Sequence, residues 1–118
     1  MTEPDDLKLP DEITKNIAKA KRYTLRIYRR GPKRDHDEET AQRIHVGHLK
    51  HIFALHQKGL LLINGPLLDD DDIRGIGIFA IEDIEEVRRI DAQDPAVIAG
   101  RLTVEVHPWF GLPGDGLR

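Results

Sequence analysis

The longest periodic pattern in the chain lies between residues 38 and 58 and predicts an amphipathic helix. Its apolar face repeats at intervals of four, four and three residues and consists of Ile44, His48, Ile52 and Leu55. Asp37 or Thr40 provides the N-cap, and Gly59 ends the helix. A helix of this length has to bury its apolar face, so the neighbouring segments must supply a surface for it to cover.

Four extended segments supply that surface. The first, residues 23–28 (YTLRIY), alternates apolar and polar side chains, as a strand does. The second, residues 60–64 (LLLIN), is a short continuous apolar run, typical of a strand covered on both faces. The third is residues 74–82 (RGIGIFAIE), and the fourth is residues 102–109 (LTVEVHPW), with Leu102, Val104 and Val106 on one side.

A second helix is predicted between the third and fourth strands. Asp83 is placed to cap it, with Glu86 three residues later in the capping-box position, and the helix extends to about Ala92. Pro95 then opens a further helical turn that continues to Gly100. The order of elements is therefore β-α-β-β-α-β.

This order predicts an α+β chain with a ferredoxin-like four-stranded antiparallel sheet, covered by helices on one face. The length of 118 residues suits one domain. We assign residues 21–110 to it, residues 1–20 to a polar and partly flexible leader, and residues 111–118 to an irregular tail.

The amino-acid composition restricts the kinds of chemistry and the cellular compartments that are possible for the protein. The chain has no cysteine, which excludes disulfides, thiolate nucleophiles and cysteine-based zinc sites and fits a reducing cytoplasm. The acidic, proline-broken N-terminus does not have the pattern of a signal peptide, and no apolar run is long enough to cross a bilayer. We therefore expect a cytoplasmic protein without a membrane partner.

The uncovered face of the sheet needs a partner. Residues 74–81 (RGIGIFAI) resemble the RNP1 pattern of RNA-recognition domains, but Ile76, Ile78 and Ile81 occupy the positions where aromatic side chains stack on bases. With a net charge of −3, we expect no nucleic-acid partner. An apolar sheet face predicts a homodimer packed face to face; alternatively, the leader or the tail folds back over the sheet.

Four of the six histidines lie between residues 45 and 56, which raises the question of a metal site. His45, His48 and His51 spread over about 120° of helix surface, and the i,i+4 pairing of an HExxH helix is absent. We predict neither a metal nor another cofactor. The run Asp69–Asp72 lacks the spacing of a calcium loop and is expected to be a solvated hairpin loop.

Several short motifs in a fixed order resemble the YciI (YCII-related) family. They are His48-Leu49 on the long helix, G-x-L-x-x-x-GP at 59–66, RGIGIF at 74–79, DP-x-x-x-AG at 94–100 and VEVHPW at 104–109. The resemblance implies a small dimeric protein with a ferredoxin-like fold, related to the muconolactone-isomerase-like dimeric α+β barrels. It also implies lyase or isomerase chemistry, such as dehydrochlorination of a ring compound, in a cleft at the dimer interface.

By the same resemblance, the catalytic pair of this family falls on His48 and Asp94. Relatives often carry an arginine three residues before the histidine, where this chain has His45, and its own arginine is Arg43. A partly buried imidazole beside a carboxylate can take a proton from carbon or oxygen and return it elsewhere. Two structural readings compete with this one: His48 as a core histidine, and Asp94 as the N-cap of the turn that Pro95 opens.

We therefore expect a metal-free acid–base enzyme acting on a small anionic or cyclic metabolite. The catalytic residues would be His48 and Asp94. The substrate-binding residues would be His45, Arg43, Gly65, Pro66 and His107. The alternative is a non-catalytic small-molecule-binding or accessory protein that uses the same cleft.

Overall fold

A computed structural model describes residues 4–118, and its elements follow the predicted order. The strands are β1 (Lys21–Arg30), β2 (Leu61–Pro66), β3 (Ile73–Phe79) and β4 (Leu102–Gly111). The helices are η1 (Asp5–Leu7), α1 (Asp11–Ile17), α2 (Glu38–Gln57), α3 (Ile84–Asp91) and α4 (Pro95–Ile98). Asp37 caps α2, Asp83 caps α3 and Asp94 caps α4, each by accepting a backbone N–H bond.

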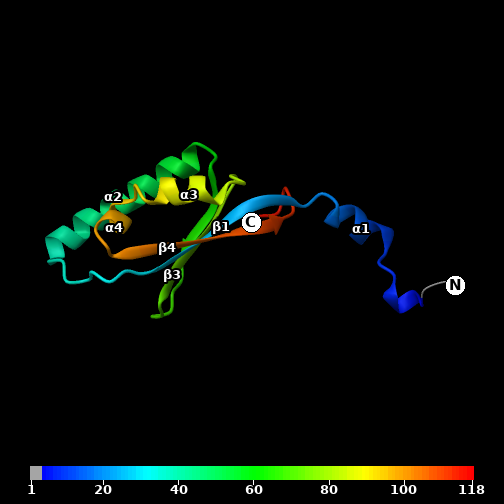
Figure 1. The fold of residues 1–118 in the computed structure, drawn as a ribbon, viewed down its shortest axis with the longest axis horizontal. Coiled ribbons are helices and arrows are strands. Elements are labelled where there is room, and N and C mark those ends of the chain that lie inside the picture. The colour runs from blue at the N-terminus through cyan, green and yellow to red at the C-terminus, as the bar shows by residue number, and fades with distance from the viewer. Residues whose placement is uncertain (1–3) are drawn as a thin grey trace.

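The strands form one antiparallel sheet in the order β2-β3-β1-β4, with α2, α3 and α4 on one of its faces (Figure 1). The two βαβ halves interleave so that β1 and β3 lie at the centre of the sheet. This is the ferredoxin-like plan, and the predicted fold class is confirmed.

The polar side of β1 faces the helices. Thr24, Arg26 and Tyr28 are buried, whereas Leu25 and Ile27 on the other side are only partly covered. Arg26 on this side is 0% exposed, although a strand with one polar and one aliphatic side places its polar side toward solvent by default. The guanidinium is tolerated inside because Asp91 at the end of α3 pairs with it.

The apolar core lies between the sheet and the helices. It consists of Leu55, Leu61, Phe79, Ile81, Val87 and Val106. Ile52 of α2 packs against this core, as the periodicity of the helix predicts. Ile81, in contrast, does not lie on the open side of the sheet with Ile76 and Ile78. It stands two residues after the buried Phe79 and belongs to the core with it.

The strand β2 is an edge strand, and the expectation that both of its faces are covered is wrong. It pairs only with β3, and its residues alternate in burial: Leu61 is 1% exposed and Leu62 is 43% exposed. Continuous apolar runs occur in strands covered on both faces, but this run also supplies the rim of a hollow beside α2.

The side of the sheet away from the helices is apolar at its centre, and we call it the open face. Its apolar residues, matched by strand register, are Tyr23, Leu25, Ile27, Ile63, Ile76, Ile78 and Trp109, and Glu105 and His107 of β4 lie on the same face. Trp109 lies here beside the Tyr23 ring, at 6.2 Å between ring centroids, and not against the helix layer.

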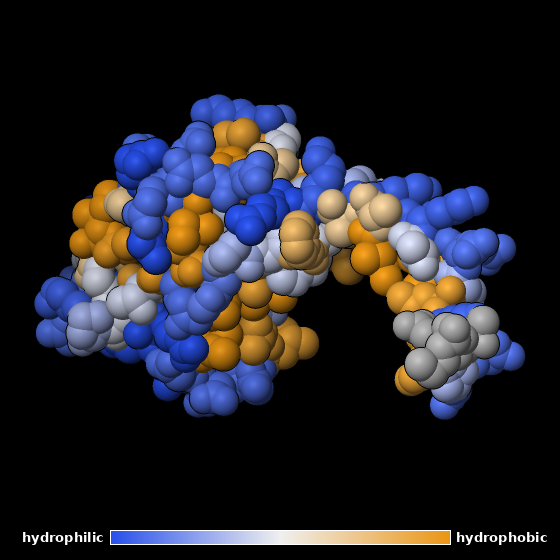
Figure 2. All heavy atoms as spheres, turned by 45° about the vertical axis from the view of Figure 1, so that its right-hand side comes forward, coloured by the Kyte–Doolittle hydropathy of each residue, from blue (hydrophilic) through white to orange (hydrophobic). Residues whose placement is uncertain are grey.

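The leader does not fold back over the open face. Figure 1 shows η1 and α1 as an arm that projects away from the sheet, and the molecule is 69 Å long and 29 Å wide. Apolar side chains gather on this arm as well as on the body (Figure 2); Leu7, Leu9, Ile13 and Ile17 are all exposed. Within residues 4–118, no helix has the length and apolar character needed to cross a membrane.

Candidate active site

The carboxylate of Asp94 is completely buried and accepts hydrogen bonds on both oxygens. Its Oδ1 accepts the backbone N–H of Ala96, 2.9 Å away, which caps α4. Its Oδ2 accepts the Tyr28 hydroxyl at 2.7 Å and lies 2.6 Å from Nδ1 of His48. The cap and the contact with the imidazole therefore coexist, because each uses a different oxygen.

These contacts decide the charge of Asp94. Burial acts to raise the pKa of its carboxyl, but the hydrogen bonds from His48, Tyr28 and the Ala96 amide outweigh burial and hold that pKa below its usual value. An ionised carboxylate only accepts hydrogen bonds, so the proton in the contact with His48 belongs to Nδ1. The other ring nitrogen, Nε2, is then free to accept a proton.

Tyr28 acts as a neutral hydrogen-bond donor. Burial raises the pKa of its phenol, with Asp91 and Asp94 acting in the same direction and Arg26 opposing them. The hydroxyl therefore keeps its proton for Asp94. The Tyr28 ring also meets the His48 ring edge-on, at 5.4 Å between centroids, which limits rotation of the imidazole.

A buried ion pair lies directly beneath this group. Arg26 donates from Nε to Asp91 Oδ2 at 3.0 Å and from Nη1 to Asn64 Oδ1 at 3.1 Å. Its guanidinium carbon lies 3.7 Å from the centroid of the Tyr28 ring, a close cation–π contact. Gly77 on the neighbouring strand leaves room for the guanidinium, since a Cβ there would lie 3.1 Å from three of its atoms.

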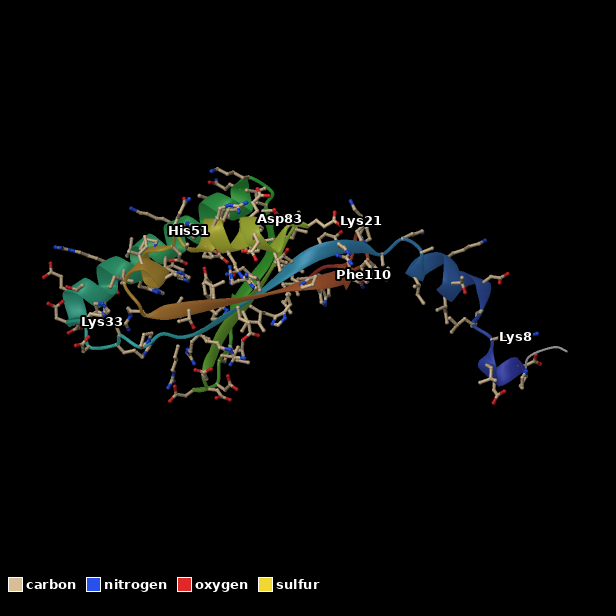
Figure 3. The ribbon with its side chains drawn as sticks, in the orientation of Figure 1. Lys8, Lys21, Lys33, His51, Asp83 and Phe110 are labelled. Carbon is tan, nitrogen blue, oxygen red and sulfur yellow. The ribbon has the colours of Figure 1, made fainter. Side chains whose placement is uncertain are left out.

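A second histidine of α2, His51, lies near the Asp91 carboxylate of this ion pair, one helical turn after His48. Nε2 of His51 lies 3.8 Å from Asp91 Oδ1, too far for a hydrogen bond, and Figure 3 shows His51 on the α2 side of the helix layer. Within residues 4–118, His51 Nε2, Asp91 Oδ1 and Arg26 Nη2 are buried and have no hydrogen-bond partner. His51 and Asp91 are therefore placed much as His48 and Asp94 are, but they form no hydrogen bond with each other.

His48 opens onto a cavity of about 400 Å³, within the range of small-metabolite sites. Tyr28, His45, Leu49 and Asn64 line it with His48. The remaining lining residues are Arg34, Ala41, Ile44, Gly65, Pro66, Arg74, Gly75, Ala96, Arg101 and Leu102. His48 is 17% exposed in its side chain, which suits a group that must meet a ligand and still be held from behind.

The structure brings together some of the predicted site residues and separates others. His45, Gly65 and Pro66 share the cavity with His48. Arg43 does not reach it: it lies on the exposed side of α2 and pairs with Glu39, because it stands five residues from His48 and points elsewhere on the helix. His107 lies on the open face, paired with Glu105, and does not line the cavity either.

A second, wider hollow of 1110 Å³ lies on the other side of Leu49 and Asn64, which line both. It is bounded by α2, by the open face and by the tail from Gly111 to Leu117. Val46, Leu49 and Phe53 form its α2 wall, a second apolar stripe at intervals of three and four residues. In the part of the chain described, no group of three or more His, Cys, Asp or Glu residues is arranged to hold a metal ion.

The family is decided by residues 21–110, which match the model of the YCII-related domain. The chain belongs to the YCII-related family. The match covers the whole sheet and the three helices on it, apart from the last residue of β4. In this YCII-related chain, both the HL motif and the DP motif contribute to the His48–Asp94 contact.

A solved structure with a similar fold is 5-chloro-2-hydroxyhydroquinone dehydrochlorinase from Burkholderia phenoliruptrix, in complex with 2,5-dihydroxybenzoquinone. It shares 24% sequence identity, with a TM-score of 0.53, and the alignment covers 73% of the present chain and 92% of that enzyme. At this identity the likeness concerns the fold. A comparison with curated protein sequences finds no match.

Sequence reasoning missed three contributors to this region: Tyr28, Arg26 and Asp91. All three are buried around the cavity or beneath it. The available signal was a polar alternation, Thr24-Arg26-Tyr28, on a strand whose other side is aliphatic. Such a strand places its polar side toward solvent by default, and only partners from α3 and α4 reverse that choice.

Proposed function

We propose that this protein is an acid–base enzyme of the lyase or isomerase type that acts on a small metabolite. His48 would be the proton acceptor and Asp94 the carboxylate that holds it. The observation that carries the proposal is the 2.6 Å contact between His48 Nδ1 and a buried, ionised Asp94, with Nε2 left free beside a cavity. A general base needs an atom that can accept a proton within reach of the substrate and a partner that holds the base in position.

The reaction begins when Nε2 of His48 takes a proton from a carbon or hydroxyl group of the substrate. The electron pair left behind forms a double bond, and either a leaving group departs or the proton returns to another atom. Asp94 stabilises the imidazolium that forms, because its negative charge is buried and lies 2.6 Å away. Tyr28 keeps Asp94 in place throughout and does not exchange its proton.

The dehydrochlorinase with a similar fold supports this class of chemistry. Its name describes an elimination, and its ligand, 2,5-dihydroxybenzoquinone, is a small ring compound. An elimination needs a base placed at a C–H or O–H bond, and the present chain offers one in His48. His45, Gly65 and Pro66 would contact the substrate from the walls of the same cavity.

We also propose that the enzyme is a homodimer. Ile76 and Trp109 of the open face are 42% and 41% exposed, and Leu25, Ile27 and Ile78 beside them are only partly covered. An apolar sheet face of this kind would be covered by a second copy packed against it, which is also what the family resemblance implies.

The decisive experiment compares turnover with binding in His48→Gln. Chloride release from chlorinated hydroquinones and deuterium uptake from D₂O into small carbon acids are followed by ion chromatography and NMR. We expect His48→Gln to lose turnover by at least about 100-fold while ligand affinity stays within a few-fold of the wild type. Equal affinity with no turnover in either protein would point to a binding protein instead.

A further inference from the structure

The cavity beside His48 carries an excess of positive charge. Three arginines are among its lining residues, namely Arg34, Arg74 and Arg101. No aspartate or glutamate side chain is among its lining residues. The nearest carboxylate of the site, Asp94, is sealed behind His48 and Tyr28 and is fully buried.

The three arginines come from separate parts of the chain, and we call them the arginine wall. Arg34 lies in the loop between β1 and α2, at the end of the molecule where Figure 3 labels Lys33. Arg74 lies on β3, and Arg101 lies between α4 and β4. Tertiary folding alone brings them to one cavity, so they are not a run of surface charges.

The hydrogen bonds of the arginine wall go to backbone carbonyl oxygens and to an imidazole nitrogen, not to carboxylate groups. Arg34 Nη1 donates to the carbonyl of Arg101 at 2.8 Å, and Arg74 Nη1 donates to the carbonyls of Asp69 and Asp71 at 2.9 and 3.1 Å. Arg101 Nη1 lies 3.2 Å from Nδ1 of His36. Such bonds orient the guanidiniums without neutralising them.

Other arginines of the chain behave differently, since several of them form ion pairs with carboxylates. Arg26 pairs with Asp91, Arg29 with Glu105, and Arg88 with Glu85. In the arginine wall, by contrast, none of the three side chains forms an ion pair with any acid among residues 4–118.

The positive charges of these arginines also repel one another. Burial lowers the pKa of Arg34, and the neighbouring charges of Arg101, Arg30 and Arg74 lower it further, with only Asp70 opposing them. Like charges held close together are unfavourable unless an anion joins them. An oxyanion bound between the groups offsets their mutual repulsion.

We infer that the arginine wall is the binding site for a doubly charged oxyanion, carried by the substrate that His48 acts on. This inference rests on the proposed function for the reaction, although binding can be measured without it. Guanidiniums recognise carboxylate and phosphate oxygens in the same paired geometry, so the substrate is a small dicarboxylate or phosphorylated metabolite. The sequence left open whether the substrate is an anionic or a cyclic metabolite, and the arginine wall favours an anionic one.

The placement also helps the chemistry. Removing a proton from the carbon next to a carboxylate puts negative charge on the carboxylate oxygens. Cations already fixed at those oxygens stabilise that charge as it develops.

The test measures binding of malonate and of inorganic phosphate to the full-length protein by isothermal titration calorimetry. Malonamide and acetate serve as uncharged and singly charged controls. We expect a dianion to bind and malonamide not to bind, with affinity falling as sodium chloride rises from about 50 to about 500 mM. Preference for malonate over phosphate, or the reverse, identifies which oxyanion the site takes.

Variants then locate the site. Arg34→Gln, Arg74→Gln and Arg101→Gln should each weaken dianion binding by about tenfold, with Arg→Lys at the same position recovering part of it. Arg88→Gln, which removes the same charge from the exposed side of α3, should leave affinity unchanged. If Arg101→Gln does not fold, the other two positions still decide the result.

Failure of this inference differs from failure of the proposed function. Absence of dianion binding, or binding that the three arginine variants do not weaken more than Arg88→Gln does, overturns the arginine wall as a site. His48→Gln is expected to keep dianion affinity within about threefold, because its charge contribution is small beside three arginines. Dianion binding at the wall without any turnover would sustain the site and refute the enzyme.

Discussion

The site depends on Asp94. Its buried carboxylate caps α4, holds the His48 imidazole and accepts a hydrogen bond from the Tyr28 hydroxyl. Its three hydrogen bonds hold the pKa of its carboxyl below the usual value, although burial acts to raise that pKa. The charge is therefore maintained by its partners, and each partner can be removed separately.

Removing the phenol should weaken the site without unfolding it. In Tyr28→Phe the bond to Asp94 Oδ2 disappears, so the pKa of Asp94 should rise toward its usual value. We expect turnover to fall by about tenfold, and its acid limb to move to higher pH, because the carboxylate then protonates earlier as pH falls. Tyr23→Phe on the open face is the matched control. An unchanged pH profile in Tyr28→Phe would contradict this role.

The lowered pKa of Asp94 also predicts how stability depends on pH. A carboxyl with a folded-state pKa below its unfolded value of about 3.9 stabilises the fold above that value. That contribution is lost as pH falls through the lower, folded-state pKa. Chemical denaturation of Asp94→Asn should therefore show lower stability at pH 7 and a shallower decline below about pH 4. Asp35→Asn, at an exposed carboxyl, should leave most of the decline in place.

Beneath the site, Arg26 and Asp91 form a buried ion pair, and each buried charge needs the other for its stabilisation. Arg26→Met should cost about 3–5 kcal/mol of unfolding free energy, because it leaves Asp91 buried without its countercharge. The double variant Arg26→Met with Asp91→Leu should recover much of that loss, since no unpaired charge remains. Urea denaturation of the two single variants and the double variant completes the cycle, and simple additivity of the two losses would count against the pairing.

At the scale of elements, β1 and β3 hold the site by their register. The pairing of Arg26 with Gly77 places a residue without a side chain opposite the guanidinium. Likewise, Tyr28 pairs with Gly75, which lines the cavity with it. A strand with glycines at these two positions makes space on the inner side of the sheet, while Ile76 and Ile78 keep the open face apolar.

This register predicts unequal tolerance of alanine at two glycines of the sheet. Gly77→Ala would put a Cβ 3.1 Å from the Arg26 guanidinium, so it should destabilise the fold by about 1–3 kcal/mol through overpacking. Gly65→Ala meets no atom within 4 Å and should have little effect on stability. Thermal unfolding of both variants tests the difference, and equal behaviour would show that the guanidinium moves aside freely.

The helix α2 serves two surfaces, and only one of them was evident from its periodicity. Ile52 and Leu55 pack against the sheet, as predicted. Val46, Leu49 and Phe53 form the second stripe, exposed by 38%, 51% and 60%, and face the wide hollow next to the open face. A helix that is apolar on two sides needs a second partner, which links this element to the assembly.

At the scale of the whole molecule, the uncovered parts are the open face, the second stripe of α2 and the projecting arm. All three expose apolar side chains. The tail from Gly111 to Leu117 borders the hollow between the open face and the second stripe of α2, and Trp109, Leu49 and Phe53 remain exposed beside it. A homodimer packed through the open face would remove the largest of these surfaces from water.

The dimer predicts that a single charge in the open face will separate the subunits. Ile76→Glu should shift the protein to a monomer in light scattering after gel filtration, because the carboxylate would be buried unpaired at the interface. Ile98→Glu on α4, at an exposed position outside the open face, should leave the mass unchanged. A wild type that is already monomeric at micromolar concentration would refute the assembly.

The sequence by itself was sufficient for the order of elements and for the helix caps at Asp83 and Asp94, and it left Asp37 and Thr40 as alternatives for the cap of the long helix. The pairing of His48 with Asp94 came from the family resemblance. The order and the caps follow from local rules, namely periodicity, capping and the βαββαβ plan. Local rules act over a few residues, so a single chain of letters is enough to apply them.

Only the tertiary structure decided which side of β1 faces the helices and which charges meet at the cavity. Arg26 is buried because Asp91, 65 positions away in the chain, pairs with it. The arginine wall likewise exists only because three distant segments converge on His48. Pairing between distant charges can reverse the preference of a polar side chain for water, and no local pattern reports where its partner will be.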